Sequence, residues 1–509
     1  MPYGGRSPRA GYPGRDAAGV SGSSDPGLAR YRWAGRPENA AGRRCQRGHL
    51  SGSARGRTGR CGPSSSGYRR RPADAGGYFA GTRQLRAGTG PAARLPGLDG
   101  AASKRSRAML ETGSAGMMIA VIGGNLQGIE AAYLSHKAGW EVMLIDRRPA
   151  PPAAALCDRF EQFNVSSPGE TARLLNKADL VLPALENREA LNVLTTCARA
   201  GDLPLAFDPS AYAVSSSKIR SNRVFDSLGI RVPAAWPGCG FPVMIKPDTA
   251  SGSEGVRVIQ RMADFPPEPD MPEKYVIQSY TPGPVYSLEV MGTPGAYRPL
   301  EVVALEMDAV FDCKRVVAPS GLSPDPVHRF EQMAVTLAEA LRLKGLMDLE
   351  VILNDGRLVL LEIDARLPSQ TPSAVYWSTG LNMMAEMGNL FLDSGKVQSG
   401  KAFRDHRPRA VIYEHIQVRK KTLAVGGEHL MSGASPVTVR TDFFGADEAV
   451  TNYRPKNDDW VATLIFAASD RRQVWEKRNA AIAAIRRHCR IAQYIDDSPG
   501  TGEKPEKRT

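Results

Sequence analysis

The sequence predicts an α/β protein of several domains that follows a long, unfolded N-terminal extension. Three observations lead to this prediction. A strand, a glycine-rich turn, a helix and a second strand follow one another between Met118 and Asp146, which is the order of a Rossmann-like unit. Further apolar runs of strand and helix type continue as far as residue 495. A hairpin within residues 345–373 carries four acidic side chains on its two strands.

Residues 1–116 carry the chain's excess of positive charge. The 509-residue chain has a formal net charge of +13. The extension holds 21 Lys and Arg against 6 Asp and Glu, a net of +15, so the other 393 residues hold 45 basic and 47 acidic residues, a net of −2. A protein that binds a polyanion needs a basic surface on its folded part. The balance therefore argues against nucleic acid as a partner.

The extension has the composition of a disordered segment. It is rich in Gly, Arg, Ser, Pro and Ala and has no apolar periodicity, so it cannot bury enough surface to offset its ordering entropy. A basic arm that binds RNA is one interpretation. We favour translated upstream sequence with no role in the fold, because Met117-Met118 opens a strand directly.

Cysteine usage and hydropathy indicate a chain that stays in the cytoplasm. The seven cysteines are odd in number and scattered, and no Cys-x-x-Cys pair suggests a zinc site or a redox dithiol. No apolar run has the length of a membrane span, and no apolar segment of signal-peptide type follows the N-terminus. We therefore expect a cytoplasmic protein without a membrane partner.

The Rossmann-like opening raises the question of a dinucleotide. The first strand, Met118–Ile122, is followed by a glycine-rich turn at 123–128, and the second strand ends at Asp146. Asn125 replaces the middle glycine of the dinucleotide fingerprint, and its side chain would obstruct a pyrophosphate. We therefore expect a structural role for this domain. It spans residues 117–212 and includes further short strands at 180–186 and 205–207.

A second region, residues 213–283, has the pattern of a phosphate-binding subdomain. Serines at 215–217 precede a helix, and a strand ends on Lys246 before a Ser/Gly loop at 251–256. Backbone N–H groups of such a loop can surround phosphate oxygens, and Lys246 adds a positive charge. Gly-rich loops between strands are usually plain hairpin turns, so the prediction depends on the lysine and the loop together. The loop is not a Walker A motif, because no Gly-Lys-Ser/Thr opens a helix.

The acidic hairpin is the centre of the third region, residues 284–495. Two apolar runs, 347–353 and 358–363, are joined by an Asn-Asp-Gly turn at 354–356. The strand acids are Asp348, Glu350, Glu362 and Asp364. Side chains alternate across a strand, so the two acids of each strand share a face. A two-residue loop would place Glu350 and Glu362 on opposite faces of the sheet, whereas a three-residue loop ending in a left-handed glycine would place all four acids on one face.

Four acids on one face would require positive charge among them. Carboxylates about 4 Å apart repel by roughly 4 kcal/mol per pair at an effective dielectric near 20. Oxygen-only ligands at that density suit Mg²⁺ carrying nucleotide phosphates better than zinc. Arg366, two residues past Asp364, would project to the same side. The alternative is a half-buried hairpin whose acids face water.

The order of these motifs resembles the ATP-grasp superfamily. The resemblance covers about residues 117–420, and it rests on Lys218, the strand ending at Lys246, the 251–256 loop, a strand at 275–280, Glu350 and the run from Leu361 to Arg366. It implies an ATP-grasp fold with an N-terminal Rossmann-like domain, a lid at 213–283 and a catalytic hairpin within 284–495.

The resemblance also implies roles for individual residues. Lys218 and Lys246 would contact the α- and β-phosphates of ATP. The loop residues Ser251, Gly252, Ser253, Gly255 and Val256 would close over the triphosphate, and backbone groups of Gln278, Ser279 and Tyr280 would hold adenine. Glu350, Glu362 and Asp364 would hold two Mg²⁺ ions, and Arg366 would stabilise an acyl phosphate. Gln278 and Val285 stand where many members of the superfamily have acids, so no ribose ligand is assigned.

Within the superfamily, the chain is similar to the family of pyrrolysine-biosynthesis ligases. The similarity lies in residues 122–139, 285–290 and 311–319. Those ligases join the carboxylate of (3R)-3-methyl-D-ornithine to the ε-amine of L-lysine, so the resemblance implies that these amino acids are the substrates. Both carry ammonium groups, which call for further carboxylates. The candidates are Glu289, with Ser287 on the same face, and Asp312.

Two other activities remain as alternatives. A different ligase of the same fold, dipeptide-forming or carboxylating, is the nearer one. An NAD-dependent oxidoreductase is more distant, because Asn125 and the acidic hairpin oppose it. We also expect a possible homodimer, and a loose, charged tail at residues 496–509.

Overall fold

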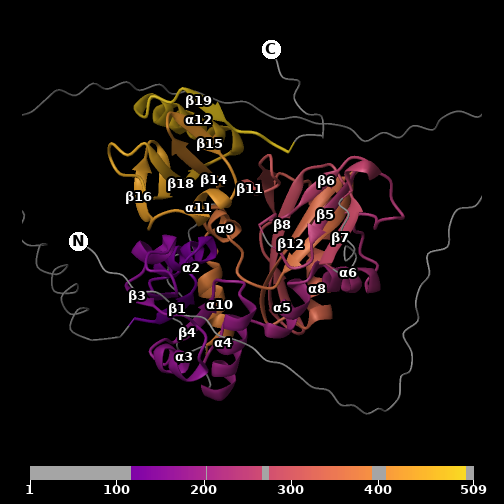
Figure 1. Cartoon of the computed structure of the whole chain (residues 1–509), viewed down its shortest axis with the longest axis horizontal. Helices are drawn as coiled ribbons and strands as arrows, with labels where there is room; N and C mark the ends of the chain where they lie inside the picture. The colour runs from indigo at the N-terminus through magenta and orange to yellow at the C-terminus, as the bar shows by residue number, and fades with distance from the viewer. Residues whose placement is uncertain (1–115, 202, 251, 266–273, 393–408, 500–509) are drawn as a thin grey trace, which may run out of the picture. The chain divides into compact units, whose positions relative to one another are not determined.

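The computed structural model describes residues 116–201, 203–250, 252–265, 274–392 and 409–499 (Figure 1). Residues 1–115 lie outside this part of the chain, so the disorder of the extension stays a prediction. Among the described residues, no helix has both the length and the apolar character that a membrane span requires.

The first domain is a parallel sheet with the strand order β3-β2-β1-β4. Its strands are β1 (Met118–Ile122), β2 (Glu141–Asp146), β3 (Arg159–Gln162) and β4 (Leu180–Pro183). Its helices are α2 (Leu126–Lys137), η1 (Pro152–Leu156), α3 (Pro168–Leu175) and α4 (Arg188–Gly201). The central strands are buried along nearly their whole length, which explains why they read as continuous apolar runs.

The strand predicted at 205–207 is not formed. Leu205 makes only an isolated bridge to Val181. The chain turns at once into α5 (Pro209–Ser215), where the Asp208 carboxylate accepts hydrogen bonds from the first free N–H groups of the helix. This cap starts the helix before the strand can extend.

The glycine-rich turn of the first domain is closed by its own side chains. The Asp146 carboxylate accepts a hydrogen bond from the Gly124 N–H at 2.8 Å and pairs with Arg148 at 2.8 Å. Arg148 also donates to the Asn125 side chain at 2.6 Å. The acid that would hold a ribose in a dinucleotide site is therefore engaged, which agrees with the expected structural role.

The lid contains an antiparallel three-stranded sheet and two short helices. The sheet has the order β6-β5-β7, with β5 at Val243–Pro247, β6 at Arg257–Ile259 and β7 at Tyr275–Ser279. The remaining elements are α5, α6 (Lys218–Ser227) and η2 (Met262–Asp264). Ser217 caps α6 by accepting from the Arg220 N–H, so Lys218 begins the helix next to the sheet.

The third region is built on one large sheet with the order β13-β12-β8-β10-β11-β14-β18-β17-β16, and every neighbouring pair on this path is antiparallel. Strands β9, β15 and β19 pair at its sides. The strands are β8 (Val285–Thr293), β9 (Ala296–Pro299), β10 (Val303–Met307), β11 (Cys313–Ala318), β12 (Gly345–Asn354), β13 (Arg357–Asp364), β14 (Ala410–Arg419), β15 (Thr422–Val425), β16 (Thr438–Phe443), β17 (Ala446–Thr451), β18 (Asp459–Ala468) and β19 (Gln493–Ile495).

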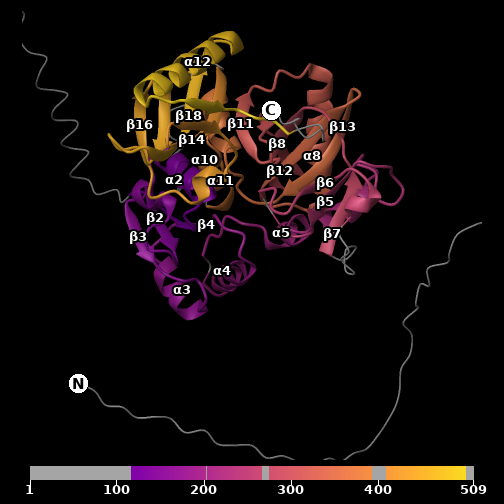
Figure 2. The ribbon, with the colours of Figure 1, turned by 45° about the horizontal axis from the view of Figure 1, so that its top comes forward.

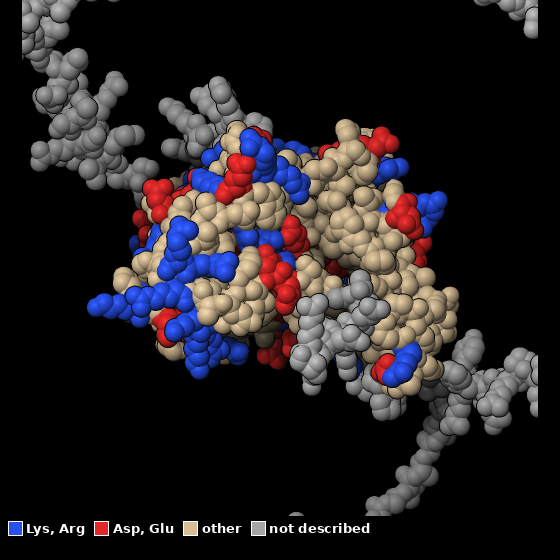
Figure 3. Space-filling model, turned by 90° about the horizontal axis from the view of Figure 1, so that it is seen from above, with Lys and Arg blue, Asp and Glu red and all other residues tan. Residues whose placement is uncertain are grey.

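Helices cover this sheet. They are α8 (Pro324–Leu341), α9 (Thr371–Thr379), α10 (Met383–Phe391), α11 (His429–Ser432) and α12 (Arg471–His488). Figure 2 shows α12 lying across β14 and β18, against which it packs. On the face seen in Figure 3, basic and acidic side chains are interspersed, as the nearly balanced charge of residues 117–509 predicts.

A buried polar network joins the first domain to the large sheet. Glu130 on α2 accepts hydrogen bonds from Ser373 on α9 and from Tyr413 on β14. Burial raises the pKa of Glu130 to about 6, against the lowering effect of both hydroxyl donors. The contact fixes α2 of the first domain against α9 and β14.

The tail differs from the expectation over its first residues. Lys314, almost fully buried on β11, donates to the Asp497 carbonyl at 2.6 Å and pairs with the Asp496 carboxylate at 2.8 Å. Residues 496–499 are therefore tied to the sheet and are not loose. Residues 500–509 lie outside the described part of the chain.

Candidate active site

The acidic hairpin places its four carboxylates on one face by a route that the sequence did not predict. The connecting turn contains two residues, Asp355 and Gly356, both with positive φ, and Asn354 pairs with Arg357. This is the geometry of a type I′ turn. A β-bulge then inserts Leu361, since Val351 pairs with Leu360 but Glu350 pairs with Glu362. The turn is therefore the two-residue alternative, which by itself would place Glu350 and Glu362 on opposite faces, and the bulge supplies the odd residue that brings them together.

This register brings the acids into two opposed pairs. Glu350 lies opposite Glu362, and Asp348 lies opposite Asp364. Burial, reinforced by the neighbouring carboxylates, raises the pKa of Glu350 to about 8 and that of Asp364 to about 7, and raises that of Asp348 well above its usual range. Solvated acids on a wet face would not behave in this way, so the alternative of a plain solvated hairpin is not supported.

Glu362 is the exception, because two lysines face it. Lys218 Nζ lies 3.4 Å from its Oε2, and Lys246 lies at the end of β5. Burial alone would raise the pKa of Glu362, but the two ammonium groups outweigh it and hold that pKa below its ordinary value. Burial lowers the pKa of Lys246, whereas Glu362 favours its charged form. The hairpin and the lid thus meet through opposite charges.

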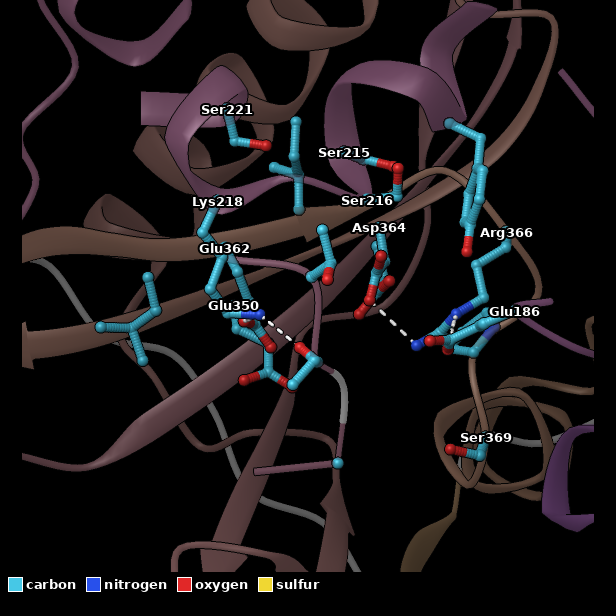
Figure 4. Close-up of a pocket in the computed structure, with 18 of the residues that line it drawn as sticks. Glu186, Ser215, Ser216, Lys218, Ser221, Glu350, Glu362, Asp364, Arg366 and Ser369 are labelled. Carbon is cyan, nitrogen blue, oxygen red and sulfur yellow. Dashed lines mark hydrogen bonds and ion pairs between the residues drawn. The ribbon is translucent and has the colours of Figure 1, made fainter. Parts of the chain in front are cut away.

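Arg366 connects the hairpin to the first domain. Its Nη2 donates to Asp364 Oδ2 at 2.9 Å, and its Nε forms an ion pair with Glu186 Oε1 at 2.9 Å (Figure 4). Glu186 follows β4, at the carboxyl edge of the parallel sheet. We did not predict it as a site residue. The signal was present, since ligand-binding residues of open α/β sheets gather beyond the carboxyl ends of the strands.

These residues line a cavity of about 530 Å³. Its wall contains acidic residues from the first domain and from the third region: Glu186, Asp312, Asp348, Glu350, Glu362, Asp364 and Glu428. The basic residues of the same wall are Arg188, Lys218, Arg220 and Arg366. Tyr212, Ser369 and Glu428 also belong to the wall and were not anticipated. The predicted catalytic and metal-ligating residues are therefore brought together.

A neighbouring cavity of about 320 Å³ lies between the lid and the large sheet. The predicted nucleotide-binding residues that line it are Lys218, Lys246, Gly252, Ser253, Val256, Gln278, Ser279 and Tyr280. Glu350 and Glu362 line both cavities. The N–H groups of Ser279 and Tyr280 already donate to the carbonyls of Ala234 and Pro242, at 2.8 and 2.9 Å, so they are engaged within the lid.

The Ser/Gly loop contacts the large sheet. Ser253 Oγ donates to the Phe311 carbonyl at 2.6 Å. A Cβ on Gly252 would approach the Glu428 carboxylate to 3.0 Å, and Gly255 has a φ of +73° beside Pro247. Ser251 lies outside the described residues, so its predicted role is not addressed. The loop therefore lies between the two cavities and the β10–β11 turn.

The predicted substrate residues are placed differently from one another. Ser287 and Glu289 on β8 are fully buried, opposite Glu350 and Asp348, and are not among the residues that line either cavity. Burial raises the pKa of Glu289 to about 7. Asp312 does line the larger cavity. It lies in the β10–β11 turn, where its carboxylate accepts hydrogen bonds from the His429 N–H at 3.0 Å and lies 2.6 Å from His429 Nδ1.

Comparisons with known proteins agree with this geometry. Residues 215–370 match the family of ATP-grasp domains. The biotin carboxylase domain of 2-oxoglutarate carboxylase from Hydrogenobacter thermophilus, solved with MgADP and bicarbonate, has 13% identity, covers 72% of this chain and 90% of that one, and gives a TM-score of 0.55. The L-amino acid ligase of Bacillus licheniformis has 14% identity, covers 72% and 97%, and gives a TM-score of 0.54. The fold and the site define an ATP-grasp ligase.

Sequence similarity identifies the family more closely. The 3-methyl-D-ornithine–L-lysine ligase of Methanosarcina mazei is 33% identical over 372 residues, which cover 72% of this chain and 95% of that protein. The chain belongs to the family of 3-methyl-D-ornithine–L-lysine ligases. The predicted fold class, superfamily and ligase class are thereby confirmed, and the oxidoreductase alternative is wrong.

Proposed function

We propose that this chain uses ATP to join the carboxylate of an ornithine-type D-amino acid, 3-methyl-D-ornithine, to the ε-amine of L-lysine. The observation that carries the proposal is the single, partly buried face on which the hairpin acids, two lysines and Arg366 converge. Family membership supplies the substrate pair, and the two adjoining cavities give room for a nucleotide and for the amino acids.

The acid face fits divalent cations. Glu350, Glu362 and Asp364 offer only carboxylate oxygens, which Mg²⁺ prefers. Burial and the neighbouring carboxylates raise the pKa values of Glu350 and Asp364, so a cation bound between these acids would be favoured. We infer that two Mg²⁺ ions are held there. When bound, Mg²⁺ neutralises the charge that develops on transferring phosphate oxygens.

The chain's own residues position the phosphates. Lys218 lines both cavities and Lys246 lines the smaller one, where they can contact the α- and β-phosphates of ATP. Gln278, Ser279 and Tyr280 border the far part of the smaller cavity and are proposed to hold adenine. Because the Ser279 and Tyr280 N–H groups are engaged, the base is recognised through other groups of these residues.

Two steps then give the amide. The ornithine carboxylate oxygen attacks the γ-phosphorus, the bond to the ADP oxygen breaks, and an acyl phosphate forms. The lysine amine attacks the acyl carbon, phosphate leaves, and the amine nitrogen loses a proton. Arg366, held between Asp364 and Glu186, is positioned to stabilise the anionic acyl phosphate. The loop carrying Ser253 covers the site and excludes water, which would hydrolyse that intermediate.

The ammonium groups of the two amino acids require carboxylates outside the metal site. Asp312 and Glu428 line the larger cavity next to Arg366 and suit this task. Glu289 lies on β8, directly opposite Asp348 of β12. We propose that it supports the hairpin acids from this neighbouring strand. A free lysine amine has a pKa near 10.4, so its approach to the acyl carbon also requires desolvation or a nearby base.

The test is product analysis with the full-length protein. D-ornithine, or its 3-methyl form, and L-lysine together should give one ε-amide with one ADP and one phosphate, and either amino acid alone should give little turnover. Mass spectrometry of the product and phosphate release measure this. If another amino-acid pair gives an amide while these two do not, the ligase class stands and the substrate assignment falls. The cytoplasmic location and a homodimer stay predictions.

A further inference from the structure

The start of the C-terminal tail reaches the smaller cavity. After β19 the chain crosses toward β11, as both ribbon views show (Figures 1 and 2). Ser498 and Pro499 belong to the wall of the cavity that also contains Lys246 and the 278–280 segment. Ser498 and Pro499 lie more than 200 positions after the lid in the sequence, so no local motif connects them to the nucleotide site.

A group of buried ion pairs holds the tail in this position. Asp496 pairs with Arg315 at 2.9 Å, with Lys314 at 2.8 Å and with Arg478 of α12 at 3.3 Å. Burial would raise the pKa of Asp496, but Arg315 and Lys314 together lower it to about 2. Lys314 also donates to the Asp497 carbonyl at 2.6 Å and to Ser498 Oγ at 3.3 Å. The tail is thus fixed at three consecutive residues immediately before it enters the cavity wall.

A β-bulge makes this anchor possible. Cys313 pairs with Met307 and Arg315 pairs with Glu306, so Lys314 is the extra residue of β11. Consecutive residues of a regular strand point to opposite faces. Because the bulge interrupts this alternation, the side chains of both Lys314 and Arg315 reach Asp496. Both side chains are almost fully buried, and ion pairs formed in such surroundings are weakly screened by salt.

Removal of the tail would affect Arg315 and Lys314 unequally, because they differ in their other partners. Arg315 also pairs with Glu306 and with the fully buried Glu414, which Arg478 contacts as well. Within the described part of the chain, in contrast, the partners of the Lys314 ammonium group all belong to residues 496–498. Glu306 itself lines the smaller cavity. The anchor is therefore continuous with the cavity wall on the β10 side.

From these contacts we infer that residues 496–499 are part of the nucleotide site, in which they close one wall of the pocket and raise its affinity for the nucleotide. This rests on the proposed function only in that the smaller cavity is taken to hold ATP. The tail acts on nucleotide binding and is not assigned any contact with the amino acids. We therefore expect that loss of the tail changes KM for ATP and Kd for ADP more than it changes KM for either amino acid.

Two truncations give a matched test. A chain that ends at Ile495 lacks the whole tail, whereas a chain that ends at Pro499 lacks only residues 500–509 and keeps the anchor and the wall. Titration calorimetry with ADP and Mg²⁺ should show binding about tenfold weaker for the first chain and unchanged for the second. Thermal unfolding without nucleotide reports whether both chains remain folded.

Two point variants keep the test decisive if the shorter chain fails to fold. Asp496→Asn weakens the anchor, and Pro499→Gly trims the wall while the anchor is kept. Each should weaken ADP binding several-fold. Equal ADP affinity in the folded variants and the full-length chain would overturn the inference. A full-length chain that does not bind ADP at all would instead contradict the proposed function, so the two failures are distinguishable.

Discussion

The Glu186 carboxylate of the first domain lies 2.9 Å from Nε of Arg366, which lies two residues past the end of the acidic hairpin. The same guanidinium donates to Asp364 at 2.9 Å, so Arg366 is held between two acids from different parts of the chain. The first domain therefore contributes to the site through a positioning residue, although its own glycine-rich turn is closed by Asp146 and Arg148.

Replacement of Glu186 should impair the chemical step more than nucleotide binding. In Glu186→Gln the side chain keeps its size but the ion pair with Arg366 is lost, so the guanidinium is less firmly oriented toward the acyl phosphate. We expect kcat to fall about tenfold, or roughly 1.4 kcal/mol of transition-state stabilisation, with KM for ATP changed much less. Steady-state kinetics measures this, with Glu170→Gln on the surface of α3 as the control. An unchanged kcat would remove Glu186 from the site.

Glu362 should be far more sensitive, because it faces both lysines and the proposed metal ions. Glu362→Gln is expected to lower kcat at least about 100-fold, roughly 2.7 kcal/mol. The free energy of unfolding should change little, because the relieved repulsion with Glu350 is offset by the lost attraction to Lys218 and Lys246. The measurements are turnover over a range of Mg²⁺ concentrations and thermal unfolding, with Glu476→Gln on the exposed face of α12 as the control. Normal turnover at saturating Mg²⁺ would show that Glu362 is no metal ligand.

Local sequence rules predicted much of the architecture but not the contacts between distant segments. Alternation within each strand correctly grouped Asp348 with Glu350 and Glu362 with Asp364. Whether these two pairs of acids lie on the same face depended on a bulge at Leu361, which the residues of the turn do not predict. A bulge is decided by how a strand packs on its neighbours, so sequence reasoning left open whether the four acids share a face.

The missed residues share one property: their partners are far away in the sequence. Glu186 meets Arg366 across 180 positions, and Asp496 meets Arg315 across 181. Neither acid lies in a recognisable motif. The tail is charged and has no apolar periodicity, so its sequence does not indicate that it pairs with buried cations. Only the assembled sheet brings these pairs together.

The buried carboxyl of Glu289 should make stability depend on pH. Its pKa is raised to about 7, compared with about 4.3 for an unfolded glutamate, so its contribution to stability is fully present below about pH 4 and is lost as the pH rises through 7. By pH 8 the loss should be about 3 kcal/mol. Chemical denaturation of the metal-free protein from pH 5 to pH 8 should therefore give a steeper decline for the natural chain than for Glu289→Gln. Parallel declines would show that the carboxyl ionises without cost.

Ser253 offers a test of water exclusion that is separate from nucleotide binding. Its hydroxyl donates to the Phe311 carbonyl at 2.6 Å and so joins the Ser/Gly loop to the β10–β11 turn. In Ser253→Ala the loop loses this bond and should open more often while an acyl phosphate is present. We expect phosphate release to continue at a rate within about threefold of the natural chain, whereas the amide formed per phosphate falls at least twofold, because water competes with the lysine amine. Parallel assays of phosphate and of amide by mass spectrometry measure this ratio. Ser253→Gly also lacks the hydroxyl but tolerates the positive φ of 58° at this position, so it should lose the coupling to the same extent if the hydrogen bond is the cause. If Ser253→Ala makes one amide per phosphate, the hydrogen bond to Phe311 does not protect the intermediate.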